Sequence, residues 1–225
     1  MLSLPKSTEF NKRIPKQKFY DNLDISPTLK KAFIQQIQAV YWRNKLAPAT
    51  MNISAGKQVT ELEVFEIVLT SQEVNEAVLR QIDREIPYHI LFILTFGNKS
   101  RFAVSYKEPT ESGKNAFQVG RYFWGSWVEC DKLSVQLNGL DLDTVLENMI
   151  REIGNIHVTE GNSLGQQIEV NAQREKLEKE IERLERLARK EVQPRKKYEL
   201  VKRIKELKTN QGKNNEFRKF GNECS

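Results

Sequence analysis

Acidic side chains near a lysine are the pattern in this sequence that comes closest to a catalytic site. Metal-dependent nucleases hold a divalent cation with carboxylates and place a lysine beside the attacked phosphate. One apolar segment supplies Glu61, Glu63 and Glu66, and Lys107 ends a later one. The usual acid-x-lysine spacing is absent, because Ser105 stands where the acid should be. A divergent metal-dependent nuclease with these four residues is one hypothesis; in the alternative, Glu61 and Glu63 face water from a strand and Lys107 is a strand-end charge.

The two histidines, His89 and His157, could each act as a base or a metal ligand. Neither has a cysteine or a second histidine at metal-ligand spacing, so we expect a hydrogen-bonded structural role for His89. The sequence also lacks the Gly-x-Ser-x-Gly, Gly-x-x-x-x-Gly-Lys and Gly-x-Gly-x-x-Gly motifs. These observations argue against an ATPase or a dinucleotide-binding enzyme and indicate no cofactor.

An aromatic run follows Arg121 and contains Tyr122, Phe123, Trp124 and Trp127. Such a run could stack bases, as the aromatic side chains of single-strand-binding proteins do. Aromatic and aliphatic residues that alternate along a strand are more often part of a core, and we favour that interpretation here.

Basic residues gather near the end of the sequence. From Ala172 to Ser225 there are 17 Lys and Arg against 10 Asp and Glu, whereas the remainder carries 19 against 20. Such a segment predicts an electrostatic partner, for example nucleic acid or an acidic protein. Glutamates at intrahelical pairing distance moderate its field, and we favour a partner protein over a nucleic-acid stripe. The basic side chains that would bind this partner are Arg183, Arg186, Arg189, Lys190, Arg195, Lys196, Lys197, Lys202 and Arg203.

The cysteines and the apolar stretches bear on the compartment. Cys130 and Cys224 are far apart and indicate neither a disulfide framework nor a Cys-x-x-Cys metal site. No stretch approaches the ~20 apolar residues that span a bilayer, and Pro5, Lys6 and Glu9 interrupt any secretion signal. We therefore expect a cytoplasmic protein without a membrane partner.

The elements that must position these residues predict an α+β fold with a mainly antiparallel sheet packed with helices. Apolar residues at spacings of three and four predict helices, and runs rich in β-branched and aromatic residues predict strands. The predicted elements are a helix from Ser26-Pro27 to about Ala47, a central strand over 61–69, a helix over 71–85, a hairpin over 89–106 that turns at Gly97-Asn98, further sheet over 117–128 and a helix over 140–153.

The same patterns divide the chain into successive parts. Residues 1–25 predict an arm packed on the body, and residues 26–154 form that α+β body. Gly154, Gly161 and Gly165 predict a linker over 155–171. Residues 172–209 predict a charged, coiled-coil-like helical hairpin interrupted at Pro194, and few apolar groups predict a disordered tail over 210–225.

Several stretches together resemble a bacterial domain family of unknown function, number 4391. They are Leu4-Pro5-Lys6, Phe10-Asn11-Lys12, Ile14-Pro15-Lys16, Tyr41-Trp42-Arg43-Asn44-Lys45-Leu46-Ala47, Thr60-Glu61-Leu62-Glu63-Val64-Phe65, Val78-Leu79-Arg80-Gln81-Ile82-Asp83 and Ile86-Pro87-Tyr88. The resemblance covers nearly the whole chain. It implies accessory proteins encoded beside DNA methyltransferases and helicases, as in restriction-modification and phage-defence islands, and it supplies no catalytic residue.

Three functions follow as hypotheses. The first is a non-catalytic accessory or docking subunit of a DNA-modification or phage-defence complex, with methyltransferase or helicase subunits as partners. The second is the divergent metal-dependent nuclease. The third is a nucleic-acid-binding protein that acts through the basic tail, with affinity that falls steeply with salt.

Overall fold

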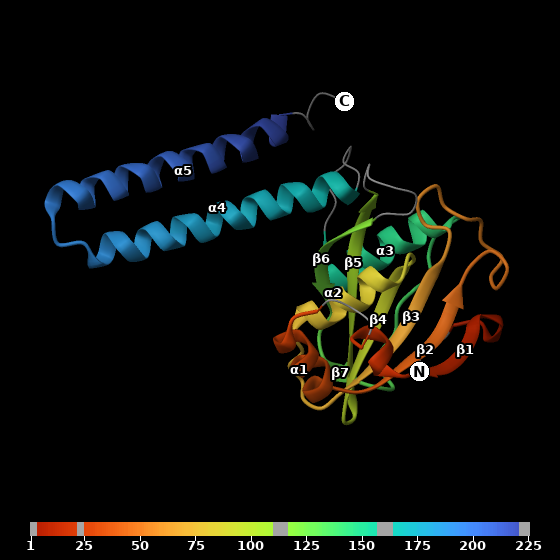
Figure 1. Ribbon diagram of the computed structural model, residues 1–225. Helices are drawn as coiled ribbons and strands as arrows, with labels where there is room; N and C mark the ends of the chain where they lie inside the picture. The colour runs from red at the N-terminus through yellow and green to blue at the C-terminus, as the bar shows by residue number, and fades with distance from the viewer. Residues whose placement is uncertain (1–3, 22–24, 110–116, 157–163, 221–225) are drawn as a thin grey trace. The chain divides into compact units, whose positions relative to one another are not determined.

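A computed structural model describes residues 4–21, 25–109, 117–156 and 164–220 of the chain. The chain divides into two compact units, residues 1–157 and residues 158–225. We call the first unit the body and the second the helical pair (Figure 1). Within the described residues, none of the helices has the length and apolar character needed to cross a membrane.

The body is built on one twisted sheet with the strand order β1-β2-β3-β4-β5-β6, and a short β7 also pairs with β5. The pairs are antiparallel except β3 with β4, which run parallel and are joined through helix α2. This arrangement confirms the predicted α+β class with a mainly antiparallel sheet. The elements are β1 (Glu9–Ile14), α1 (Pro27–Gln36), β2 (Ile37–Leu46), β3 (Leu62–Leu69), α2 (Glu76–Glu85), β4 (His89–Phe96), β5 (Lys99–Pro109), β6 (Phe117–Trp124), β7 (Val128–Glu129) and α3 (Leu142–Gly154), with 3-10 turns at Lys6–Thr8 and Lys16–Phe19.

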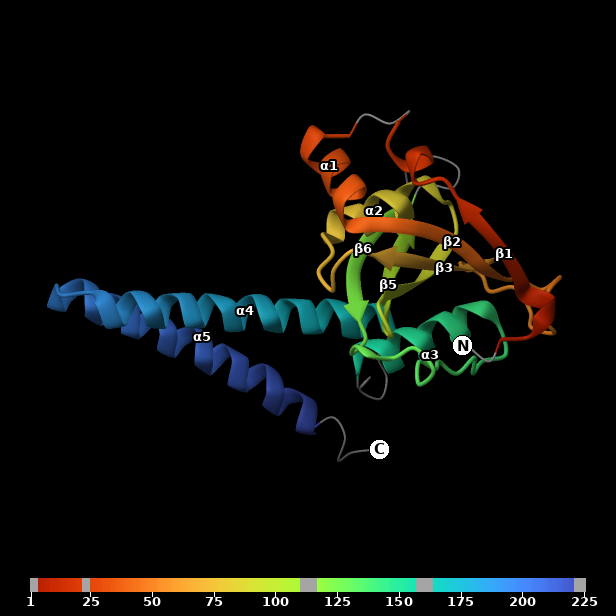
Figure 2. The same ribbon diagram turned by 90° about the horizontal axis from the view of Figure 1, so that it is seen from below.

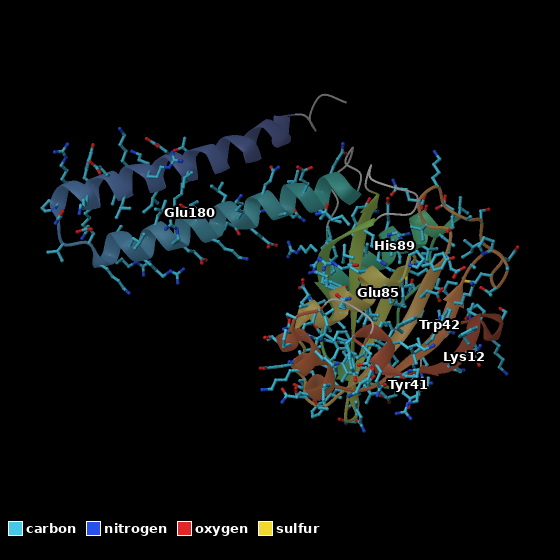
Figure 3. All side chains as sticks on the ribbon, in the orientation of Figure 1. Lys12, Tyr41, Trp42, Glu85, His89 and Glu180 are labelled. Carbon is cyan, nitrogen blue, oxygen red and sulfur yellow. The ribbon has the colours of Figure 1, made fainter. Side chains whose placement is uncertain are left out.

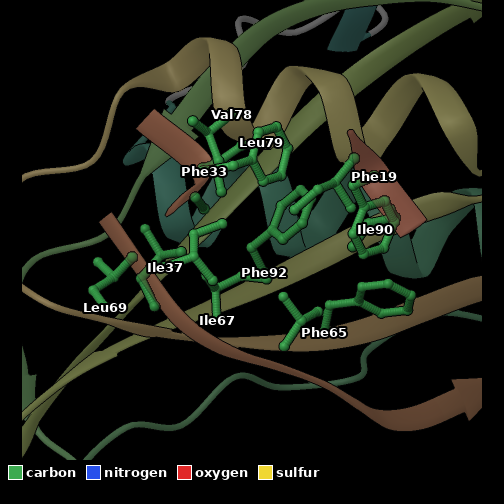
Figure 4. Close-up of a cluster of buried hydrophobic side chains, with 14 of the residues drawn as sticks. Phe19, Phe33, Ile37, Phe65, Ile67, Leu69, Val78, Leu79, Ile90 and Phe92 are labelled. Carbon is green, nitrogen blue, oxygen red and sulfur yellow. The ribbon is translucent and has the colours of Figure 1, made fainter. Parts of the chain in front are cut away.

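One face of the sheet packs against α1 and α2 and forms the main core (Figure 4). Phe65 on β3 and Phe92 on β4 lie side by side in the parallel register. Phe33 from α1 and Leu79 from α2 close over them, and all four side chains are fully buried. Burying each such side chain contributes roughly 1.5–3 kcal/mol. Helix α3 packs on β5 and β6 from the other side of the sheet (Figure 2).

The predicted helix from residue 26 to about 47 is wrong in its second half. Ser26 caps the helix by accepting a hydrogen bond from Leu29 N, and Pro27 takes the first helical position, as expected. The helix ends at Gln36, and the next ten residues form β2. The error arose because Ile37, Val40 and Tyr41 fit a helical spacing by chance. Their β-branched and aromatic side chains instead favour a strand between β1 and β3.

The other predicted body elements are present with shifted ends. Helix α2 begins only at Glu76, where Asn75 caps it. The hairpin of β4 and β5 turns at Gly97, whose φ of 60° suits a glycine. Both β6 and β7 pair with β5, and Asp141 caps α3. Residues 4–21 of the predicted arm contribute the edge strand β1 and the buried side chains of Phe19 and Tyr20.

The second unit consists of α4 (Leu164–Lys190) and α5 (Pro194–Phe220), which contact each other. Lys208 Nζ lies 2.8 Å from Glu185 Oε1 across the pair. The predicted linker over 155–171 is too long, because α4 already starts at Leu164. The predicted disordered tail over 210–225 is helical to Phe220, and residues 221–225 lie outside the described residues. Extending a formed helix costs less than starting one, because nucleation is the unfavourable step. Coiled-coil packing stays a prediction.

Candidate functional site

Glu63 is a buried acid at the centre of the predicted nuclease set, with only 1% of its surface exposed. Trp42 on β2 (Figure 3) donates its indole Nε1–H to Glu63 Oε2 over 2.5 Å. The Trp42 ring packs between Phe10 and Phe65, with centroid distances of 4.1 and 5.8 Å. The other oxygen, Glu63 Oε1, is buried and accepts no hydrogen bond from any described residue. An ionised Glu63 would therefore be poorly solvated.

Glu61 and Lys45 complete this cluster. Glu61 lies within hydrogen-bonding range of Glu63, and Lys45 Nζ lies 2.7 Å from Glu61 Oε2. Burial, followed by the carboxylate of Glu61, raises the pKa of Glu63 to about 8. Burial also acts to raise the pKa of Glu61, but hydrogen bonds with Glu63 and Lys45 outweigh it and lower that pKa. At neutral pH the pair therefore carries one proton, which is on Glu63. Glu61 is the carboxylate that pairs with Lys45.

Glu66 lies apart from this cluster. Successive side chains of a strand alternate between the two faces of the sheet, so Glu66 and Glu63 on β3 point in opposite directions. Glu66 Oε2 accepts hydrogen bonds from Arg43, with Nη2 at 2.5 Å and Nε at 2.6 Å. Glu66 Oε1 accepts one from Thr95 at 3.0 Å. Its partners mark a structural ion pair across β2, β3 and β4.

Lys107 is an internal cation, with 2% of its surface exposed. Its Nζ donates to the carbonyl oxygens of Asp83, Ile86 and Tyr88 at 2.8, 3.0 and 2.6 Å. It also forms an ion pair with Asp83 Oδ1 at 3.0 Å. Lys107 thus caps the end of α2 and neutralises Asp83, and the interpretation of Lys107 as a strand-end charge is wrong.

Asp83 is the residue of this network that the sequence did not single out. Its Oδ2 accepts hydrogen bonds from Ser105 Oγ at 2.6 Å and from Tyr122 Oη at 2.5 Å. Burial and the negative charge of Asp83 raise the pKa of Tyr122. Burial lowers the pKa of Lys107, while Asp83 opposes that change. Asp83 Oδ1 receives no hydrogen bond within the described residues and is balanced by its ion pair with Lys107. The four side chains together bind α2 to β5 and β6.

The four residues predicted for a nuclease site are therefore divided among three places in the body. Only Glu61 and Glu63 come together. No group of three or more His, Cys, Asp or Glu that could hold a metal ion occurs within the described ranges.

Comparison with known proteins places the chain in a family. The sequence model of the family described as "Domain of unknown function (DUF4391)" matches residues 2–210. The chain belongs to the DUF4391 family. No curated protein matches it, and no solved structure does. The match thus confirms the family that the sequence resembles and spans both the body and the helical pair of this DUF4391 member.

Of the two histidines of this DUF4391 member, His89 lies within the described residues. His89 opens β4 (Figure 3) and is buried. Burial, followed by the charge of Lys107, lowers the pKa of His89 to about 4, so the ring is neutral at neutral pH. His157 lies outside the described residues.

The aromatic run belongs partly to the core, as predicted. Tyr122 and Phe123 are buried, whereas Trp124 and Trp127 are half-buried. The side chain of Arg101, from the neighbouring strand β5, lies over the rings of both tryptophans. The sequence did not indicate this contact, because Arg101 comes from a different segment than the two tryptophans.

The nine basic residues predicted to bind a partner all have exposed side chains. Four of them pair with a glutamate three or four residues away on the same helix, and such exposed pairs contribute little stability. These four are Arg183, Arg189, Arg195 and Arg203. The other five predicted binding residues, Arg186, Lys190, Lys196, Lys197 and Lys202, also project from the helices into solvent.

Proposed function

We propose that this DUF4391 protein is a non-catalytic accessory subunit of a bacterial, cytoplasmic DNA-modification or phage-defence complex. The body is a docking module, and the helical pair is a tether that binds a partner subunit. The observation that carries the proposal is the exposure of all nine predicted basic side chains on a separate two-helix unit. Surfaces of this kind attract acidic partners.

The apolar side chains of the helical pair support a protein partner. Among the described side chains of α4 and α5, Ile181, Leu184 and Ala188 are the buried apolar ones. Tyr198 and Val201 on α5 are exposed despite their size. Two helices with so small a core gain little stability from each other. A partner that covered these side chains would supply the missing apolar contact.

The partner class comes from the family resemblance. It favours a DNA methyltransferase or a helicase subunit, because the related genes resemble accessory members of such clusters. An acidic surface on that subunit would complement the lysines and arginines of α4 and α5.

The test is affinity purification of the tagged full-length chain from its native cells, with partners identified by mass spectrometry. We expect a DNA methyltransferase or helicase subunit to be recovered. A triple variant, Arg186→Glu, Lys190→Glu and Lys197→Glu, should recover at least about tenfold less. The matched control reverses three exposed basic residues of the body, Lys18→Glu, Lys31→Glu and Arg84→Glu, and should recover as much as the natural chain.

Two outcomes would overturn the proposal. One is recovery of neither enzyme class with the natural chain. The other is tight DNA binding by the purified protein that requires the helical pair and weakens steeply with salt, which would make the pair a nucleic-acid tether.

A further inference from the structure

Arg101 is held against two tryptophan rings on the body. Its guanidinium carbon lies 4.5 Å from the ring centroid of Trp124 and 4.9 Å from that of Trp127. Trp124 ends β6, which pairs with β5, and Trp127 lies just before β7. Stacking on aromatic faces fixes the plane of a guanidinium and reduces the entropy that it loses when it binds a ligand.

One hydrogen-bond donor of this guanidinium lacks an acceptor among the described residues. Arg101 Nε is buried, and no acceptor among the described residues bonds to it. Burial lowers the pKa of Arg101. A partly desolvated cation without a hydrogen-bonded partner is costly, and an anion that accepted bonds from it would recover that cost.

A second cation and a further aromatic ring lie on the same face of the hairpin. Lys99 precedes Arg101 by two residues on β5, so both side chains point to one face. Lys99 is exposed and stands opposite Phe96 in the β4–β5 register, and 36% of the Phe96 surface is exposed. Glu129, which also stands opposite Lys99, is bound to Lys132 at 2.5 Å. We call Phe96, Lys99, Arg101, Trp124 and Trp127 the arginine–tryptophan patch.

We propose that the arginine–tryptophan patch binds a phosphate group of single-stranded nucleic acid. The planar guanidinium of Arg101 matches two phosphate oxygens with two parallel N–H donors. Lys99 adds a charge beside it, and the exposed ring of Phe96 offers a face for a base. An acidic peptide would use the two cations but would gain nothing from the ring. This site lies in the body and does not depend on the proposed docking role of the helical pair.

The test measures binding of a fluorescently labelled oligothymidylate by anisotropy, across a salt series. The full-length chain carries the Arg186→Glu, Lys190→Glu and Lys197→Glu substitutions as a common background, so that the helical pair contributes little. We expect Arg101→Gln to weaken binding about tenfold and Arg101→Lys to weaken it less, because lysine keeps the charge but not the paired donors. Arg84→Gln, at an exposed arginine of α2, is the matched control and should bind like the background.

Competitors identify the source of the phosphate. Inorganic phosphate at the same phosphate concentration should compete poorly with the oligonucleotide if neighbouring bases contribute. Equal competition would mean that the ligand is a free phosphate ester and not a nucleic-acid strand. Dependence of that binding on Arg101 would still support the phosphate site. Unchanged oligonucleotide binding by folded Arg101→Gln and Arg101→Lys chains would overturn the proposal, as would stronger Arg101-dependent binding of polyglutamate. Thermal melting of each variant verifies folding.

Discussion

Asp83 on α2 and Lys107 on β5 form an ion pair of 3.0 Å in which both side chains are almost completely buried. Helix α2 connects β3 to β4, and β5 lies on the other side of β4 from β3. The ion pair therefore attaches this connecting helix to β5. Buried ion pairs are stable only when further hydrogen bonds satisfy both charges. Here Ser105 and Tyr122 donate to Asp83 Oδ2, Lys107 pairs with Asp83 Oδ1, and three carbonyl oxygens accept hydrogen bonds from the ammonium.

Removing one charge of this pair should destabilise the body strongly. Lys107→Met leaves the Asp83 carboxylate buried without its cation and removes the donor for the last carbonyls of α2. We expect the free energy of unfolding to fall by about 3–5 kcal/mol, measured by urea denaturation. The double variant Lys107→Met with Asp83→Leu should lose less than the sum of the single losses. Additive losses would mean that the two side chains are not coupled.

The Glu61–Glu63 cluster should make stability depend on pH. The pKa of Glu63 is about 8 in the folded protein, above its ordinary value of 4.5. Between these values the folded chain binds a proton that the unfolded chain has released, so stability falls as pH rises through this window and levels off above about pH 8. The lowered pKa of Glu61 acts in a different range, because its contribution to stability is lost only as the pH falls below 4.5.

Glu63→Gln should remove this pH dependence. The amide can accept the hydrogen bond from Trp42 and donate to Glu61, but it never ionises. We expect the free energy of unfolding at pH 8.5 to rise by about 2 kcal/mol over that of the natural chain, with little change at pH 5. The matched control is Glu73→Gln on the surface, which should leave the slope unchanged. A natural chain whose stability is flat from pH 5 to pH 8.5 would contradict the shared proton.

Asp143 in the first turn of α3 should hold the loop before β3. Its carboxylate accepts hydrogen bonds from the backbone N–H groups of Lys57, Gln58 and Val59 at 2.6, 3.2 and 2.7 Å. Asp143→Ala leaves these donors without their acceptor, and we expect the free energy of unfolding to fall by about 1–3 kcal/mol. Hydrogen exchange of the three amides should speed up, while exchange in β4 stays slow. Equal acceleration in both places would indicate general unfolding instead.

The helical pair should lose its structure independently of the body. Leu184→Asp places a charge in the small apolar contact of α4 and α5. We expect hydrogen exchange to accelerate along both helices while β4 and β5 keep their protection. Leu187→Asp, at an exposed position of the same helix, is the matched control and should change little. Loss of protection in the sheet of the Leu184→Asp chain would contradict the division into two units.

The sequence predicted most strands and helices of the body, because hydrophobic spacing and capping residues are local signals. It failed at Ile37, where a spacing compatible with a helix belongs to a strand whose identity depends on its neighbours in the sheet. It also placed the nuclease residues in one group. Alternation along β3, which separates Glu66 from Glu63, is a local signal. The burial of Glu63 is not, because it depends on Trp42 from another strand.

Asp83 and Lys107 show the same limit. A charged residue on a helix is normally solvated, and a lysine at the end of a strand is normally exposed. Only the packing of α2 across the sheet brings the two together, and spacing within either segment contains no information about that distance. Arg101 and its tryptophans were hidden for the same reason.

The parallel pairing of β3 with β4 has a consequence for how the body assembles. The pairings of β1 with β2 and of β2 with β3 join segments that follow one another in the chain, and so do those of β4 with β5 and of β5 with β6. The strands of each half can therefore pair in chain order, whereas β3 and β4 can pair only after α2 has crossed the sheet. Pairing of β3 with β4 should limit the folding rate. A chain cut within residues 71–75 should yield two fragments that reassemble by fragment complementation.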